Sequence, residues 1–143
     1  MKWVVDASVA AKWLVPEADS PLAEALLDDE LLAPDLLFAE VGNILWKKQM
    51  RGEIDAAAAQ LAARLLLQAP LEVVDSASLM ADALALAVQL QHPAYDCFYL
   101  ALAERQGVPM VTADRRLHAC CLAVDAARWG ERVRLLVSSD GSG

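Results

Sequence analysis

Residues 95–116 place a helix, a tight turn, a short apolar strand and an acid directly one after another. Apolar side chains recur at helical spacing from Phe98 to Ala103, and Gly107 stands where a helix commonly ends in the left-handed conformation. Residues 108–111 are too few for a helix and too apolar for a surface loop, so they predict a central strand. This succession favours folds in which helices pack on a buried sheet.

The same alternation of short apolar strands and helices runs through the chain. We expect strands at residues 2–6, 31–34, 70–74, 108–111 and 133–137. We expect helices at residues 7–14, from 20 onward, 35–51, 55–68, 76–91 and 95–106, then a short helical turn at 115–122 and a loop through Trp129 and Gly130. This pattern predicts an α/β fold with three α/β/α layers and a central, mainly parallel sheet of about five strands.

The chain of 143 residues is long enough for one domain with its own core, which we place at residues 1–137, followed by a flexible tail at 138–143. Charges interrupt every apolar stretch before it reaches the ~18 residues of a membrane span, and Asp6 and Lys12 break the apolar run that a signal peptide needs. The three cysteines lack the spacing of a disulfide framework. We therefore expect a cytoplasmic protein with no membrane segment.

Two acids follow predicted strands. Asp6 ends the first strand, and Asp114 comes just after the fourth. Sites in parallel sheets lie beyond the carboxyl ends of the strands, where the strand order reverses. If the first and fourth strands are neighbours, Asp6 and Asp114 face each other across that crevice.

Two further acids lie on predicted helices. Glu40 is one turn from both Leu37 and Ile44 of an apolar stripe, and Asn43 shares its face. Asp96 lies in the first turn of a largely apolar helix. Polar groups at the edge of a buried stripe need partners, and a metal ion is one such partner.

Each acid, taken alone, also has a structural explanation. Asp6 and Asp114 are suitable N-caps for the helices that follow them. Asp96 complements the dipole of its own helix, and Glu40 is a solvated flanking residue. A shared site is absent only if all four of these structural explanations hold at once.

Four segments carry these acids in order: Val4–Ser8, Ala39–Asn43, Tyr95–Ala101 and Val111–Arg116. Together they resemble the acidic motifs of PIN-domain ribonucleases, and in particular of the VapC-type toxins of bacterial toxin–antitoxin pairs. The resemblance extends from Lys2 to about Leu136. Some relatives carry a further acid after the last motif, where this chain has Arg115, Arg116 and Leu117. The number of metal ions that the site binds, one or two, therefore stays open.

The resemblance implies an endoribonuclease that depends on divalent metal ions. Crowded carboxylates need cations, and oxygen ligands without His or Cys favour Mg²⁺ or Mn²⁺. We expect Asp6, Asp96 and Asp114 as metal ligands, and Glu40 as a ligand through water or as the residue that orients the attacking water. The supporting hydrogen bonds are expected from Ser8, Thr112 and Asn43.

The same resemblance implies partners: an RNA substrate, a cognate antitoxin that is basic or has an apolar helix, and a second copy of the chain in a homodimer. Trp13 and the alanine-rich helix from Ala56 to Leu67 are apolar enough for a dimer interface or an antitoxin groove. His92 and His118 are isolated, and we expect surface or turn positions for both.

Two basic groups qualify as phosphate contacts. Arg115 and Arg116 adjoin Asp114 and are the better candidates. Lys47, Lys48 and Arg51 stand at a helix end, where the helix dipole alone favours them.

The net charge of −8 argues against a broad, non-specific nucleic-acid binder, but it suits an acidic metal pocket or a basic protein partner. A receiver domain is excluded because no lysine follows Lys48, and a haloacid-dehalogenase phosphatase would start with Asp-x-Asp, where this chain has Asp6-Ala-Ser8. The remaining alternative is a non-catalytic PIN-like scaffold that binds a protein or RNA.

Overall fold

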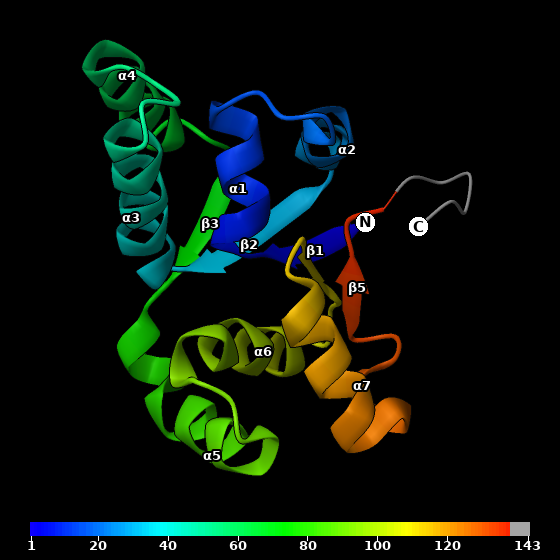
Figure 1. Cartoon of the computed structure of the whole chain (residues 1–143). Helices are drawn as coiled ribbons and strands as arrows, with labels where there is room; N and C mark the ends of the chain where they lie inside the picture. The colour runs from blue at the N-terminus through cyan, green and yellow to red at the C-terminus, as the bar shows by residue number, and fades with distance from the viewer. Residues whose placement is uncertain (138–143) are drawn as a thin grey trace.

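The structure is a computed structural model in which residues 1–137 are described (Figure 1). Its strands are β1 (Lys2–Val5), β2 (Glu30–Pro34), β3 (Leu71–Val74), β4 (Met110–Thr112) and β5 (Val133–Leu135). Its α-helices are α1 (Ala7–Leu14), α2 (Ser20–Ala25), α3 (Leu36–Met50), α4 (Ala56–Leu66), α5 (Met80–Leu90), α6 (Ala94–Gln106) and α7 (Arg115–Trp129). Two 3₁₀ turns are η1 (Leu26–Asp28) and η2 (Ser76–Leu79). The tail predicted at 138–143 lies outside the described residues.

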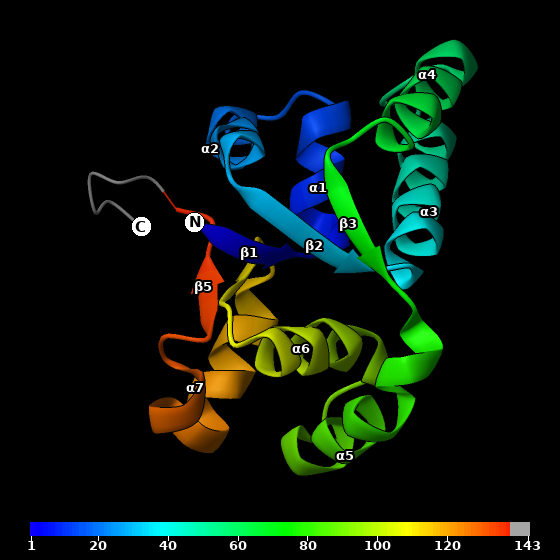
Figure 2. The ribbon, with the colours of Figure 1, turned by 180° about the vertical axis from the view of Figure 1, so that it is seen from behind.

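The strands form one five-stranded sheet in the order β3-β2-β1-β4-β5 (Figures 1 and 2). All four neighbouring pairs are parallel. β1 lies between β2 and β4, so the strand order reverses at β1. The predicted α/β fold with a parallel sheet is confirmed. The first and fourth strands are neighbours, which meets the condition for Asp6 and Asp114 to lie across one crevice.

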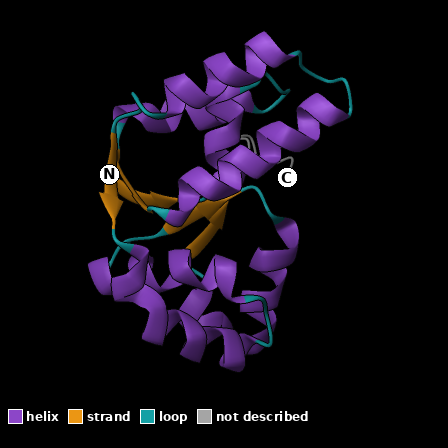
Figure 3. Ribbon diagram, turned by 90° about the vertical axis from the view of Figure 1, so that its left-hand side faces the viewer, coloured by secondary structure: helices purple, strands orange, loops and turns teal. Residues whose placement is uncertain are grey.

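Helices cover both faces of the sheet, as Figure 3 shows edge-on. α1 to α4 lie on one side and α5 to α7 on the other (Figure 1). Successive strand residues point to opposite faces: Val5 and Val111 pack with Val9 of α1, whereas Val4 and Met110 belong to the larger cluster that includes α6. The central strands are therefore buried on both faces, which explains their continuous apolar sequence.

Helix α3 starts differently from the sequence expectation. Asp35 was expected to cap α3, but its side chain makes no cap hydrogen bond to that helix. Asp35 Oδ1 accepts from the Ser76 amide at 3.1 Å instead, and Ser76 Oγ accepts from the Leu36 amide at 3.1 Å. A residue 40 positions away in the sequence thus satisfies the helix terminus, which short-range patterns cannot predict. The predicted end is confirmed, because Gly52 follows α3 with φ +74°.

Helix α7 is longer than predicted. The short turn expected at 115–122 continues to Trp129, interrupted only at Asp125, which has an extended backbone. Asp125 Oδ1 accepts from the Arg128 amide at 3.1 Å and so caps the last turn. That turn is held by the side chain of Trp129, which is 1% exposed, and by two hydrogen bonds from Arg128 to Glu104 at 2.6 and 2.9 Å. The prediction of a loop around Trp129 was therefore wrong.

No helix within residues 1–137 has the length and apolar character needed to cross a bilayer. Cys97 and Cys121 are buried, and burial raises the pKa of Cys97 to about 11 and that of Cys121 to about 12. Both thiols are therefore protonated at neutral pH and act as small apolar side chains, as the sequence indicated.

Trp129→Ala should destabilise the protein by about 3–5 kcal/mol, because it empties a fully buried position of the core at the end of α7. Trp46→Ala is the matched control, since Trp46 is 58% exposed and its removal should change the free energy of unfolding by less than about 0.5 kcal/mol. Urea denaturation followed by circular dichroism measures both. Equal destabilisation by the two substitutions would contradict the position of Trp129.

Candidate active site

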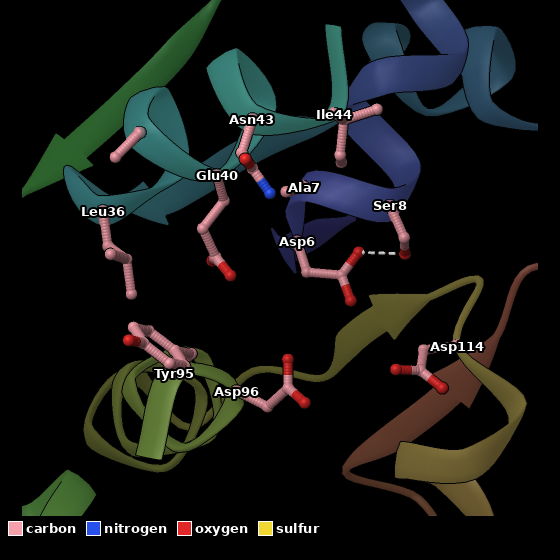
Figure 4. Close-up of a pocket in the computed structure, with 11 residues that line it drawn as sticks. Asp6, Ala7, Ser8, Leu36, Glu40, Asn43, Ile44, Tyr95, Asp96 and Asp114 are labelled. Atoms are coloured by element: carbon pink, nitrogen blue, oxygen red, sulfur yellow. Dashed lines mark hydrogen bonds between the residues drawn. The ribbon is translucent and has the colours of Figure 1, made fainter. Parts of the chain in front are cut away.

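An open cavity of about 530 Å³ lies beyond the carboxyl ends of β1 and β4. Its polar lining comes from the acids Asp6, Glu40, Asp96 and Asp114, with Ser8 and Asn43. In Figure 4, Glu40 and Asp96 point toward the space between α3 and α6, and Asp6 reaches into it from the start of α1. The four acids that the sequence singled out thus line one cavity, although they lie up to 108 positions apart in the chain.

The register of β1 and β4 brings Asp6 to this edge. Val5 pairs with Val111, so Asp6 follows β1 at the level of Thr112. The Thr112 hydroxyl donates to Asp6 Oδ2, and Ser8 Oγ donates to Asp6 Oδ1 at 2.5 Å. The Val9 amide also donates to Oδ1, at 3.1 Å. Asp6 is therefore both the N-cap of α1 and a wall of the cavity, so the two explanations of this residue are compatible.

Burial dominates the electrostatics of Asp6. The side chain belongs to a residue that is 4% exposed, and desolvation raises the pKa of Asp6 to about 6 although three hydrogen bonds lower it. The nearby charge of Asp96 raises the pKa of Asp6 further. An ionised Asp6 is costly here unless a cation joins it.

The two hydroxyls tie Asp6 to the segment that carries Asp114. Ser8 Oγ accepts from the Ala113 amide at 3.0 Å, and Thr112 Oγ1 accepts from the Asp114 amide at 3.0 Å. Asp114 in turn caps α7, with Oδ1 accepting from the amides of Arg116 at 2.9 Å and Leu117 at 3.2 Å. These contacts fix the backbone between the two acids.

Glu40 has a partner that the sequence reasoning missed. The Tyr99 hydroxyl donates to Glu40 Oε1 at 2.6 Å, and Tyr99 is fully buried. Desolvation raises the pKa of Glu40 although this hydrogen bond lowers it, and burial raises the pKa of Tyr99 far above its usual range, so Tyr99 stays a donor. The hydroxyl of a tyrosine in an apolar helical stripe needs a hydrogen-bond partner, and this requirement was the signal in the sequence for the contact.

His92 lies in the turn between α5 and α6, so the expected turn position is confirmed, but the residue is not isolated, because it contacts Asp96 of the cavity. His92 Nε2 lies 2.6 Å from Asp96 Oδ2, and the two side chains are 17% and 26% exposed. The available signal for this contact was the spacing, because His92 in the turn between α5 and α6 is four positions before Asp96 in the first turn of α6. Arg115 and Arg116 are exposed and do not line the cavity, so their role in phosphate contact stays a prediction.

The donor set suits a hard divalent cation. Four carboxylates and the Asn43 amide supply oxygen ligands around an open cavity, which is the chemistry that Mg²⁺ and Mn²⁺ prefer. Within residues 1–137, however, no three His, Cys, Asp or Glu side chains converge as a ready ligand group. Each acid contacts a protein donor, but Glu40, Asp96 and Asp114 each do so through one carboxylate oxygen among the described residues, so the second oxygen can bind an ion.

Residues 3–121 match the family model of the PIN domain. The chain belongs to the PIN-domain family. It is 40% identical over 121 residues to ribonuclease VapC3 of Pyrobaculum aerophilum, an alignment that covers 82% of this chain and 92% of that protein.

Solved structures have the same fold. The crystal structure of PAE2754 from Pyrobaculum aerophilum superposes with a TM-score of 0.67 at 29% identity, covering 84% of this chain and 79% of that one. VapC20 of Mycobacterium tuberculosis, a sarcin-ricin loop cleaving toxin, gives 0.64 at 19% identity over 83% and 94% of the chains. VapBC2 of Rickettsia felis, bound to a DNA fragment from its promoter, gives 0.62 at 13% identity over 94% and 98%.

In EDTA, the contribution of Asp6 to the stability of the wild type should fall as the pH rises from about 4 to about 6. Between these values the folded protein holds a proton on Asp6 that the unfolded chain has lost, and a pKa raised from 3.8 to about 6 corresponds to about 3 kcal/mol. Asp6→Asn removes the cost of ionising this buried carboxyl and keeps a good N-cap. The variant should therefore be more stable than the wild type at pH 8 and equally stable at pH 4.

Urea denaturation at several pH values measures this difference. The matched control is Asp55→Asn, which changes the exposed N-cap of α4 in the same way and should show no such gain. An Asp6→Asn variant less stable than wild type at pH 8 would contradict the electrostatic cost of Asp6.

Tyr99→Phe should lower the free energy of unfolding by about 1–2 kcal/mol, because Glu40 loses its donor while the ring and its packing stay. Tyr95→Phe is the control, since Tyr95 is 63% exposed and should change stability by less than about 0.5 kcal/mol. Thermal and urea denaturation of both variants test this. Equal stability of the Tyr99→Phe variant and wild type would show that the hydrogen bond contributes nothing.

Proposed function

We propose that this protein is a divalent-metal-dependent endoribonuclease and the toxin of a toxin–antitoxin pair. The observation that carries the proposal is the meeting of Asp6, Glu40, Asp96 and Asp114, from four separate segments, in one cavity at the strand-order reversal. Membership of the PIN-domain family and the similarity to ribonuclease VapC3 support RNA as the substrate.

Asp6, Asp96 and Asp114 would hold Mg²⁺ or Mn²⁺, with Glu40 as a further ligand through water. A bound ion of this kind lowers the pKa of water and neutralises charge on a phosphodiester. Ser8 and Thr112 orient Asp6 by their hydrogen bonds. The resemblance to PIN-domain ribonucleases implies products with a 5′-phosphate and a 3′-hydroxyl.

Glu40 is the residue best suited to take the proton of the attacking water. Tyr99 holds one of its oxygens, which leaves the other for a water molecule in the cavity. Its raised pKa makes it a better proton acceptor than an exposed carboxylate. His92 likewise contacts one oxygen of Asp96, with 2.6 Å between Nε2 and Oδ2, and so holds that side chain in the cavity.

A non-catalytic scaffold is the second candidate, and the observation in its favour is that the described acids do not converge as a ready ligand group. A scaffold keeps the fold and binds a protein or RNA without needing a metal ion. The two candidates differ in whether divalent ions and intact acids are required for RNA cleavage.

The partners we propose are an antitoxin and a second copy of the chain, in the cytoplasm. The surface has apolar side chains for such contacts, because Trp46 and Met50 of α3 and Leu61 and Leu65 of α4 are 45–69% exposed. Trp13, in contrast, packs against the core and donates to the Ala23 carbonyl at 2.8 Å, so it suits a structural role better than a docking role. The net charge of −8 favours a basic antitoxin.

Purified protein should cut total RNA into discrete fragments with Mn²⁺ or Mg²⁺ and not with EDTA. Asp6→Asn and Asp114→Asn should each reduce the rate by more than the about 10–100-fold typical of residues that only support a ligand. Glu24→Gln, an exposed acid of α2, is the control and should cut like wild type. Cleavage that persists in EDTA or in both Asn variants would contradict the proposal, and absence of both cleavage and Mn²⁺ binding would favour the scaffold.

A further inference from the structure

A second cavity, of about 400 Å³, opens beside the acidic one, between α1 and α3. We call it the basic groove and define it by Lys12, Glu17, Lys47, Lys48 and Arg51. Ser8 and Ile44 line both this groove and the acidic cavity, so the two spaces adjoin.

The charge of the groove is unlike that of the molecule. Four of the twelve Lys and Arg residues of a chain with net charge −8 line this one groove. Four cations and the single carboxylate of Glu17 give its lining a formal charge of +3, whereas the four acids give the adjoining cavity −4. Positive charge is therefore concentrated directly beside the acids.

The four cations divide into two pairs. Lys12 and Lys48 are neutralised by three carboxylates. Glu17 bridges them at 2.5 and 2.9 Å, Asp19 pairs with Lys12 at 2.9 Å, and Glu53 pairs with Lys48 at 3.7 Å. Lys47 and Arg51 are exposed, and within residues 1–137 neither forms an ion pair. The first pair builds the wall of the groove, and the second pair is available to a ligand.

Lys47 and Arg51 continue the site along one helix face. Asn43, which lines the acidic cavity, is four positions before Lys47, and Arg51 is four positions after it. Residues at this spacing stack one above the other, about 5–6 Å apart. The row leads from the acidic cavity into the groove. The helix dipole accounts for cations at the end of α3, but not for their position on the face that borders the acids.

We propose that the basic groove binds backbone phosphates of the RNA strand next to the phosphate that is cut, through Lys47 and Arg51. This inference rests on the proposed ribonuclease function. A strand of RNA is repelled by four carboxylates, and nearby cations offset that repulsion without reading the base sequence. An acidic segment of a protein partner would also be attracted, but a polyanion that enters the acidic cavity accounts in addition for the two cavities adjoining at Ser8 and Ile44.

The test compares two double variants that remove the same charge. Lys47→Ala/Arg51→Ala changes the groove, whereas Lys2→Ala/Arg64→Ala changes residues that line neither cavity. Both pairs are made in the wild-type and the Asp6→Asn chain. In the Asp6→Asn chain, binding of a fluorescein-labelled 20-nucleotide single-stranded RNA of mixed sequence is measured by anisotropy from 50 to 200 mM salt. In the wild-type chain, kcat and KM are measured on the RNA fragment that the protein cuts.

The groove variant should bind the RNA on the order of tenfold more weakly than the control, and the dependence of log K on log salt should flatten by about 1.4, the value for two lost phosphate contacts on a single strand. KM should rise while kcat stays, and circular dichroism should show both variants folded. Equal affinity and equal salt dependence in the two double variants would overturn the proposal and leave the groove to a protein partner. If wild type cuts no RNA, the proposed function fails, and the binding measurement alone still decides the groove.

Discussion

The parallel pairing of β1 with β4 determines where the acidic cavity forms. It places the end of β1 beside Thr112, so that Asp6 leaves the sheet next to the segment that carries Asp114. Because the strand order reverses at β1, helices of both layers begin near this edge, and the N-terminal parts of α3 and α6 contribute Glu40 and Asp96 from opposite faces. The contacts of the Thr112 hydroxyl with Asp6 and of Ser8 with the Ala113 amide depend on this register.

The same geometry makes it costly to ionise the acids of the cavity. The cavity gathers carboxylates where the sheet ends, and burial raises the pKa of both Asp6 and Glu40. The protein accommodates each acid with a local donor: hydroxyls for Asp6, a phenol for Glu40, an imidazole for Asp96 and helix amides for Asp114. The acids therefore have two sets of partners, their neighbours in the protein and the cation that the proposed reaction requires.

The sequence predicts the fold and singles out four acids that line one cavity, because both depend on local patterns. Continuous apolar runs mark Val4 and Val111 as buried strand residues, and Gly52 and Gly107 end their helices with positive φ. Contacts between distant segments were missed. Neither the Ser76 cap of α3 nor the Tyr99–Glu40 hydrogen bond has a short-range signature. The end of α7 was missed for the same reason, since burial of Trp129 overrides the weak helical pattern around Asp125.

The hydrogen bond from Tyr99 to Glu40 has an evolutionary consequence. It joins two positions 59 residues apart, on helices that belong to different layers. Loss of the phenol leaves a half-buried carboxylate without its donor, and loss of the carboxylate leaves a fully buried hydroxyl without its acceptor, whereas replacing both by apolar groups removes neither partner alone. In stability alone, each single substitution therefore costs more than the pair. Since the proposed reaction also needs the Glu40 carboxylate, position 99 has to keep a donor for that carboxylate as the family diverges.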